Sequence, residues 1–223
     1  MWLNALVLSG SIVLLASPCG SASAQETASA YTNIDANHQC SHARGTAVED
    51  YGSWHCKGYA GIGVWLSAGD QRMYVSFGPR AATEIAASET LAPFNDFYKG
   101  VIEWRLEKQQ DGKARPFAAI ARWNVARAAD NLGKKGKISG RVLVVTRLGP
   151  GAVCHVGYVD ALANANANDL AREIADKHAR AFECGKDKPV ILGKVAPGKM
   201  STFNPHAPDD ALICGARTAI QLT

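Results

Sequence analysis

The chain has 223 residues, a formal net charge of +4 and a charged fraction of 20%. A positive charge this small and this dispersed gives no electrostatic case for nucleic acid or an acidic membrane as the partner. The hydrophobic fraction of 47% is that of an ordinary globular protein, which excludes a largely disordered chain.

The first 24 residues carry no charged side chain and run from an apolar stretch into Ala22-Ser23-Ala24. An apolar core followed by small residues is typical of a signal peptide, so we predict cleavage after Ala24 and a periplasmic or secreted protein. Polar residues interrupt the apolar run before it reaches the roughly 20 residues that a membrane anchor needs. Cys19 leaves lipidation as an alternative, although Pro18 departs from the lipoprotein pattern. No transmembrane segment is predicted after cleavage.

Loss of the signal would leave 199 residues, and a chain of that length can bury about 70% of its unfolded surface as one domain. We predict a single domain over residues 25–195. Prolines and glycines are frequent after Val195, so residues 196–223 are predicted to form a mostly irregular tail. The glycine- and lysine-rich stretch 126–139 is predicted to be a basic loop, with an anion contact as the alternative.

Five cysteines remain after the predicted cleavage, and an oxidising compartment makes disulfides their expected state. Any four of them can pair in three ways. The short loop between neighbouring segments favours Cys40–Cys56, and a strand followed by a helix favours Cys154–Cys184. Cys214 would then be the unpaired thiol.

A metal site is the alternative for part of this cysteine set, because His38, Cys40 and His42 alternate along the chain. In a strand, all three side chains would point to one face and could bind a soft metal ion. The sequence offers no clear fourth ligand, and Cys40 has a favoured disulfide partner. We therefore predict surface histidines, and no metal or other cofactor.

The centre of the chain reads as three hairpins. A four-residue turn at 68–71 would pair Leu66 with Met73, Val64 with Val75 and Trp65 with Tyr74. The second hairpin joins Val101–Glu107 to Phe117–Asn124, with Ile102, Trp104 and Leu106 inside and Glu103, Arg105 and Glu107 outside. The third turns at Gly149-Pro150-Gly151 and would pair Thr146 with Cys154 and Val145 with His155. Both faces of Val142–Leu148 are largely apolar, which predicts a central strand.

A helix is predicted to follow Asn166, because Leu170, Ile174, His178 and Phe182 recur at spacings of four. Gly185 is its expected stop. A Cys154–Cys184 bond would lay this helix over the sheet face that bears Cys154, Val156 and Tyr158, and would leave Arg147 and His155 on the opposite face. A shorter helix is expected near 81–90. The predicted fold is therefore α+β, an antiparallel sheet of about six or seven strands with one principal C-terminal helix on one face.

Several short motifs together resemble those of a group of small exported bacterial proteins of unknown function. The motifs are Trp54-x-Cys56-x-Gly58-Tyr59, Ser76-Phe77-Gly78, Glu103-Trp104-Arg105, Pro116-Phe117-Ala118 and Cys154-His155-Val156-x-Tyr158-x-Asp160-Ala161. The resemblance covers roughly residues 31–184 and implies export and a shared fold. It implies no activity for any particular residue.

The most informative candidate for a binding site is the polar face of the first hairpin. Trp65, Arg72 and Tyr74 there combine stacking, hydrogen bonding and a fixed cation, which are typical of binding hot spots. The alternative is that another segment covers this face. We predict a non-catalytic binding or envelope accessory protein, with an unidentified protein or small molecule as its partner.

Whether the chain is an enzyme stays open at the level of sequence. It contains no nucleophile elbow, no zinc-protease motif, no phosphate-binding loop and no dinucleotide fingerprint. One alternative is an unrecognised catalytic site around Arg147, His155 and Asp160. Another is an inhibitor of a secreted hydrolase, which a small disulfide-bonded domain would also suit.

Overall fold

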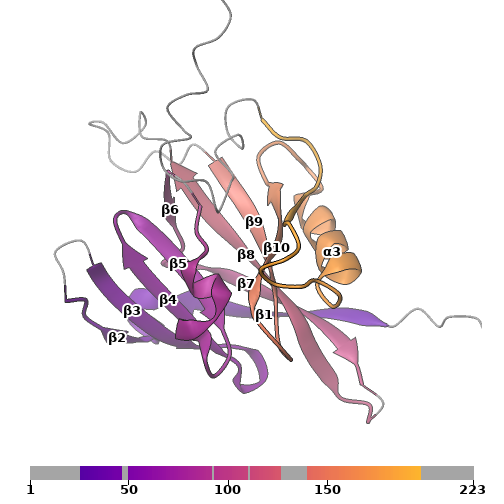
Figure 1. Ribbon diagram of the computed structural model, residues 1–223, viewed down its shortest axis with the longest axis horizontal. Helices are drawn as coiled ribbons and strands as arrows, with labels where there is room; N and C mark the ends of the chain where they lie inside the picture. The colour runs from indigo at the N-terminus through magenta and orange to yellow at the C-terminus, as the bar shows by residue number, and fades with distance from the viewer. Residues whose placement is uncertain (1–25, 47–49, 92, 110, 127–139, 197–223) are drawn as a thin grey trace, which may run out of the picture.

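The strands, in which apolar and polar residues alternate, form two sheets (Figure 1). The structure is a computed structural model, and it describes residues 26–46, 50–91, 93–109, 111–126 and 140–196. The large sheet has seven strands in the order β1-β7-β8-β9-β10-β11, with β6 paired to β8. Its strands are β1 (Thr27–Asp35), β6 (Phe94–Asp96), β7 (Lys99–Lys108), β8 (Ala114–Ala126), β9 (Gly140–Arg147), β10 (Cys154–Asp160) and β11 (Val190–Ile191). Only the β10 and β11 pairing among these is parallel. The predicted α+β class and its largely antiparallel sheet are confirmed.

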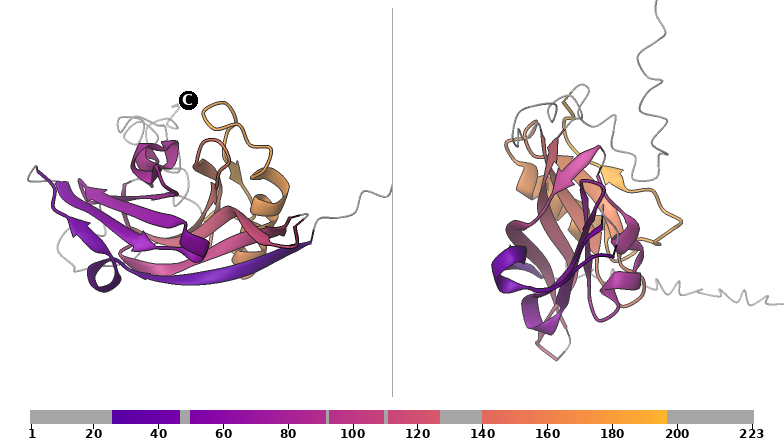
Figure 2. Two further views of the ribbon diagram at one scale, coloured as in Figure 1. Left: turned by 90° about the horizontal axis from the view of Figure 1, so that it is seen from below. Right: turned by 90° about the vertical axis from the view of Figure 1, so that its left-hand side faces the viewer.

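The small sheet has four antiparallel strands, β2 (Ser41–Ala43), β3 (Asp50–Lys57), β4 (Gly63–Gly69) and β5 (Arg72–Phe77). It contains the first predicted hairpin but is separate from the large sheet. The large sheet is the middle layer, with the small sheet on its inner face and helix α3 (Ala167–His178) on its outer face (Figures 1 and 2). The short helix α1 (Ala36–Gln39) links β1 to β2, and 3-10 turns lie at η1 (Tyr59–Gly61), η2 (Ala81–Thr83) and η3 (Ile85–Ser88). The helix expected near 81–90 is thus two such turns.

Two apolar clusters hold the three layers together. The first fills the space between the sheets and includes Leu66, Phe77 and Trp104, each at most 1% exposed. The second lies between the large sheet and α3, where Val145, Ala171 and Ile174 are fully buried. Alanines at the helix contact allow a close approach to the sheet. As predicted, β9 is central and contributes side chains to both clusters.

The two favoured disulfides are confirmed. Cys40–Cys56 joins the end of α1 to β3 with a Cα separation of 4.4 Å, and Cys154–Cys184 joins β10 to the segment after α3 with a separation of 5.8 Å. The second bond fixes the helical layer to the sheet covalently. Cys19 and Cys214 lie outside the described residues, as do the predicted signal, the tail beyond residue 196 and the basic loop over 127–139.

The register of two hairpins differs from the prediction. In the first, Gly69 pairs with Arg72, so Asp70 and Gln71 form a two-residue turn with φ values of 47° and 59°. Such a turn follows the twist of the strands better than the predicted four-residue loop. Val64 therefore faces Phe77, Leu66 faces Val75 and Trp65 faces Ser76, whereas Tyr74 faces Ser67. The assignment of residues to the inner and outer faces is unaffected, because the shift is two residues.

In the third hairpin, Cys154 pairs with Arg147 and His155 with Thr146, one position away from the prediction. A β-bulge between His155 and Gly157 then changes the alternation of β10. Val156 still packs toward α3, but Tyr158 lies in the cluster between the sheets. Arg147 shares a rung, and hence a face, with Cys154 instead of His155. The predicted face of Arg147 was wrong because the register is shifted by one residue, and that of Tyr158 was wrong because the bulge was not predicted.

Helix α3 ends earlier than expected, at His178, and the chain reaches Cys184 through turns. Asn166 occupies the N-cap position without a side-chain capping bond. His178 is exposed instead of lying on the apolar stripe, whereas Phe182 is 8% exposed and packs beneath the helical layer. Within the described ranges, no helix has the length and apolarity to cross a bilayer.

Candidate functional site

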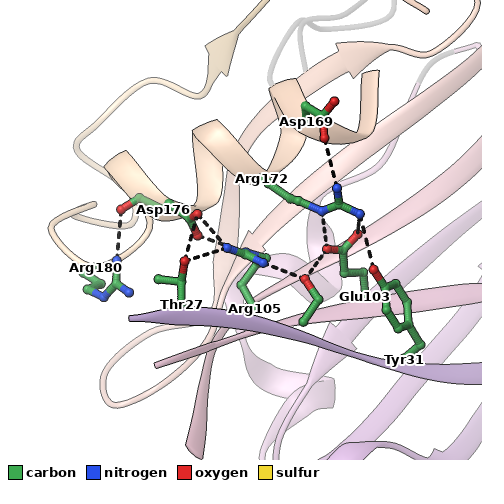
Figure 3. A network of polar contacts seen from close by, with 9 residues as sticks. Thr27, Tyr31, Glu103, Arg105, Asp169, Arg172, Asp176 and Arg180 are labelled. Carbon is green, nitrogen blue, oxygen red and sulfur yellow. Dashed lines mark hydrogen bonds and ion pairs between the residues drawn. The ribbon is translucent and has the colours of Figure 1, made fainter. Parts of the chain in front are cut away.

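The predicted outer row of β7 lies against α3 and forms ion pairs with it. Glu103 pairs with Arg172, Arg105 with Asp176, and Glu107 with Arg180, at shortest distances of 2.6, 2.7 and 2.6 Å. These three pairs, two of which are drawn in Figure 3, are here called the charge ladder. The ladder orients the helix across the sheet and defines one wall of the site described below.

Arg105 is the most enclosed member of the ladder, with 8% of its side chain exposed. Its Nε and Nη2 donate to the two carboxylate oxygens of Asp176 at 2.9 and 2.7 Å. Nη1 donates to Ser29 Oγ at 2.6 Å, and Nη2 also donates to Thr27 Oγ1 at 2.9 Å. A bidentate contact of this kind needs a planar guanidinium, which lysine cannot supply.

At the other end of the ladder, Arg172 donates to Glu103 through Nε and Nη2 and to the hydroxyl of Tyr31 through Nη2 (Figure 3). Hydrogen bonding by Glu103 raises the pKa of Arg172 above its ordinary value. Both charges of this pair are therefore already compensated. The hollow described next begins at this end of the ladder.

A groove of about 490 Å³ opens there on the outer face of the large sheet. It lies between β1, β7, β8, β9 and the first two turns of α3, and its volume is in the range of small-molecule sites. Its polar side chains are Lys99, Arg122, Asn124, Arg141, Asn168 and Arg172, with Glu103 at the wall. We call it the outer groove.

Arg122 and Arg141 dominate the electrostatics of the outer groove. The register pairs Arg122 with Leu143 and Asn124 with Arg141, so the two guanidiniums extend from diagonal positions of β8 and β9 on one face. Burial, and in second place the charge of Arg141, lower the pKa of Arg122. Arg122 Nη2 donates to Asn168 Oδ1 at 2.7 Å, which is a neutral acceptor. No carboxylate in the part of the chain that the structure describes forms an ion pair with either arginine.

The other cation of the groove, Lys99, is compensated at its rim. Lys99 Nζ lies 3.1 Å from Asp35, and Asp35 also accepts a hydrogen bond from His38 at 2.8 Å. The bond from His38, followed by that from Lys99, lowers the pKa of Asp35. Positive charge without a partner carboxylate among the described residues therefore concentrates at Arg122 and Arg141, and the outer groove is the candidate site.

The three residues predicted to bind a ligand lie on one face of the first hairpin, where Tyr74 is diagonal to Trp65 and two positions from Arg72. Trp65 is half-buried and lines a hollow of about 350 Å³ between β4 and η2. Arg72 Nε donates to the carbonyl oxygen of Pro93 at 2.9 Å, and Tyr74 pairs with Ser67. Their role in binding stays a prediction, but Arg72 and Tyr74 do not line the hollow beside Trp65.

The residues of the alternative catalytic site also have separate surroundings. His155 is 1% exposed, and its Nδ1 lies 3.0 Å from Tyr158 Oη. Arg147 donates to the carbonyl oxygens of Pro150 and Ala152 in the turn after β9. Asp160 accepts bonds from the backbone N–H groups of Leu162, Ala163 and Ala196. Each side chain supports the local backbone or the core, so the three do not form a common site.

Sequence reasoning missed a buried polar cluster around Glu89, between η3 and β10. Glu89 is 4% exposed, and its Oε2 accepts a hydrogen bond of 2.6 Å from the backbone N–H of His155 and lies 3.8 Å from His155 Nδ1. Burial raises the pKa of Glu89 to about 7, although the bond from His155 acts in the opposite direction. Burial, with the charge of Glu89 in second place, raises the pKa of Tyr158 well above its ordinary value.

The alternating histidines around Cys40 do not share a strand. His38 lies in α1 beside Asp35, Cys40 is in a disulfide, and His42 of β2 stacks on Trp54 with ring centroids 4.6 Å apart. Residues 26–196, apart from the gaps already given, contain no group of three acidic, histidine or cysteine ligands placed to hold a metal ion. No protein-family model matches the chain, and comparisons with curated proteins and with solved structures found no match.

Proposed function

We propose that this chain is an exported, disulfide-bonded binding domain that takes an anionic ligand in the outer groove. The observation that carries the proposal is the pair Arg122 and Arg141, held side by side in a hollow without a carboxylate partner among the described residues. Two like charges in one hollow repel each other, and a bound anion relieves that repulsion while accepting charge-assisted hydrogen bonds. The strands fix the backbone of both arginines, and Asn168 also holds the guanidinium of Arg122.

Export is part of the proposal and is supported by the charge-free apolar segment 1–24 together with two disulfides. The proposal also places the chain in the group of small exported bacterial proteins that its motifs resemble. A non-catalytic role is part of the proposal and is supported by the groove, where the carboxylate of Glu103 and the hydroxyl of Tyr31 are both engaged by Arg172.

We expect the intact mass of the protein recovered from the periplasm or medium to correspond to a chain that begins at Gln25. On reduction the mass should rise by two hydrogens for each of the two bridges, because the cysteines of each bridge become thiols. A lipid-sized mass increase at Cys19, or a chain that retains residues 1–24, would contradict the export route. This measurement is independent of any ligand.

Anion binding is tested by titrating the mature protein with sodium acetate at constant ionic strength, followed by backbone amide chemical shifts. We expect saturable shifts at Arg122, Asn124 and Arg141. In the double variant Arg122→Gln/Arg141→Gln, acetate affinity should fall by about tenfold, because two charge-assisted donors are lost.

Arg115→Gln is the matched control, since Arg115 is an exposed arginine on the same strand β8 but outside the outer groove. Its affinity for acetate should equal that of the parent protein. Shifts that grow without saturation, or that are the same in the double variant and the control, would overturn the proposed function.

A further inference from the structure

The outer groove has an apolar part as well as a cationic one. Among the described residues, Tyr31 and Val101 are large hydrophobic side chains with unusually high exposure, 57% and 46%. Both line this groove, together with the buried Ile120 and Leu143 of its floor. Tyr31 pairs with Glu103, two positions from Val101 on β7, so these two exposed side chains are diagonal neighbours on one face.

This apolar surface is next to the cationic one because the same strands carry both. Leu143 lies directly opposite Arg122, and Ile120 is two residues before Arg122 on the same face of β8. A ligand that contacts the arginines therefore also reaches apolar side chains. A small, fully polar anion would leave Val101 and Tyr31 in water.

Charge limits the ligand further. Arg172 is compensated by Glu103 and Lys99 by Asp35, which leaves one adjacent pair of guanidiniums without a partner carboxylate. One carboxylate has two oxygens and can accept from both groups at once. A polyanion would require a longer row of uncompensated cations than the described lining provides.

We propose that the ligand of the outer groove is a carboxylate carried on an apolar chain, with the carboxylate between Arg122 and Arg141 and the chain over Val101 and Tyr31. This inference rests on the proposed function, that is, on anion binding in the same groove. The apolar chain gains affinity by covering surface that is exposed in the free protein, and the charged head sets its direction.

The test is a titration of the mature protein with acetate, butyrate, hexanoate and octanoate, using the same amide signals. Each added methylene should strengthen binding by about two- to threefold, less than for complete burial because one side of the groove is open. Hexylammonium, which has the opposite charge, should not bind. In Arg122→Gln/Arg141→Gln, the affinity for octanoate should fall by about tenfold.

Val101→Ser tests the apolar part separately. It should reduce the gain between acetate and octanoate severalfold, because the apolar chain loses its contact with Val101 while both arginines remain. Leu162→Ser is the matched control, since Leu162 is 52% exposed but lies outside the groove. The control should show the chain-length dependence of the parent protein.

Two acylated probes distinguish a free carboxylic acid from a peptide C-terminus as the source. If N-acetyl-Ala-Ala-Leu binds more tightly than hexanoate, and its C-terminal amide does not bind, the ligand is a peptide C-terminus. If hexanoate binds more tightly than the peptide, the ligand is a free carboxylic acid. Acetate binding that does not strengthen with chain length overturns this inference and leaves the anion site intact. Octanoate binding that is unchanged in the double arginine variant overturns both.

Discussion

Replacement of Arg105 with methionine is expected to lower the free energy of unfolding by about 3 kcal/mol. The substitution keeps an apolar stem of similar length but leaves Asp176, Ser29 and Thr27 without their shared donor. Removal of one partner from an enclosed ion pair costs about 3 to 5 kcal/mol, because the remaining charge is poorly solvated. We place the effect at the lower end because 30% of the Asp176 side chain reaches water. Equilibrium unfolding in urea would measure it.

Two further variants test whether the loss of stability in Arg105→Met comes from the enclosed bidentate ion pair. Arg105→Lys keeps the charge but loses the bidentate contact, so it should be destabilised by roughly half as much. Arg180→Met removes the more exposed end of the charge ladder and should cost about 1 kcal/mol or less, since 31% of its side chain is exposed. Equal losses for Arg105→Met and Arg180→Met would show that enclosure of the Arg105 pair contributes nothing.

Glu89→Gln is expected to make the protein more stable than its parent by up to about 3 kcal/mol at pH 8, and to lose this advantage at pH 4. The folded-state pKa of Glu89 is about 7, above the value of 4.5 that applies to the unfolded chain. The folded protein therefore retains a proton that the unfolded chain has already released. The contribution of Glu89 to the free energy of unfolding is therefore greatest below about pH 4.5 and falls as pH rises toward and through 7.

Glutamine keeps the acceptor for the N–H of His155 but cannot ionise, so the variant lacks this loss of stability. The measurement is the free energy of unfolding of both proteins between pH 4 and pH 8. Glu84→Gln is the matched control, because Glu84 also accepts a hydrogen bond from the β10 region, at Val153 N, but is paired with Arg80 near solvent. A difference between parent and Glu89→Gln that does not change with pH would show that Glu89 titrates in its ordinary range.

The sequence was most informative where one residue type repeats with the period of a strand. The alternation around Trp104 assigned the inner row of β7 correctly, since Ile102 and Trp104 are fully buried. The same alternation placed Val64 and Leu66 on the inner face of β4. Both disulfides followed from the order of the elements. These features depend on local patterns, which a single sequence contains.

The register of the hairpins and the division into two sheets were predicted less accurately from the sequence. Both residues of the two-residue turn, Asp70 and Gln71, have φ above zero. Glycine is the residue that indicates this conformation in a sequence, and neither position is a glycine. The bulge after His155 moved Tyr158 to the other face. Gly157 inside the strand is a local signal for such a bulge, and the prediction did not use it. The division into two sheets arises from contacts between distant segments.

The polar residues of the candidate site can each be recognised in the sequence, but the sequence does not show that they lie together. Arg122 and Asn124 interrupt the apolar outer row of β8 after Ile120, which is a signal that the end of this strand meets water. Its significance depends on Arg141 and Asn168, which are far away in sequence and are brought together by strand order and by the direction of α3. The aromatic face of the first hairpin was predicted as the binding surface instead, because a tryptophan is a stronger local signal of such a surface than two arginines far apart in sequence.

The alternation of sign along the charge ladder has a consequence for how the chain avoids misfolding. The helix presents plus, minus, plus in Arg172, Asp176 and Arg180, and the strand presents minus, plus, minus in Glu103, Arg105 and Glu107. A slip of the helix by one turn would leave two facing positions, with arginine against arginine at one and carboxylate against carboxylate at the other. The alanines at the helix contact are small and alike, so apolar packing alone would tolerate such a slip. The charge ladder therefore favours one alignment of helix and sheet, and it raises the free energy of the alignments that are shifted by one turn.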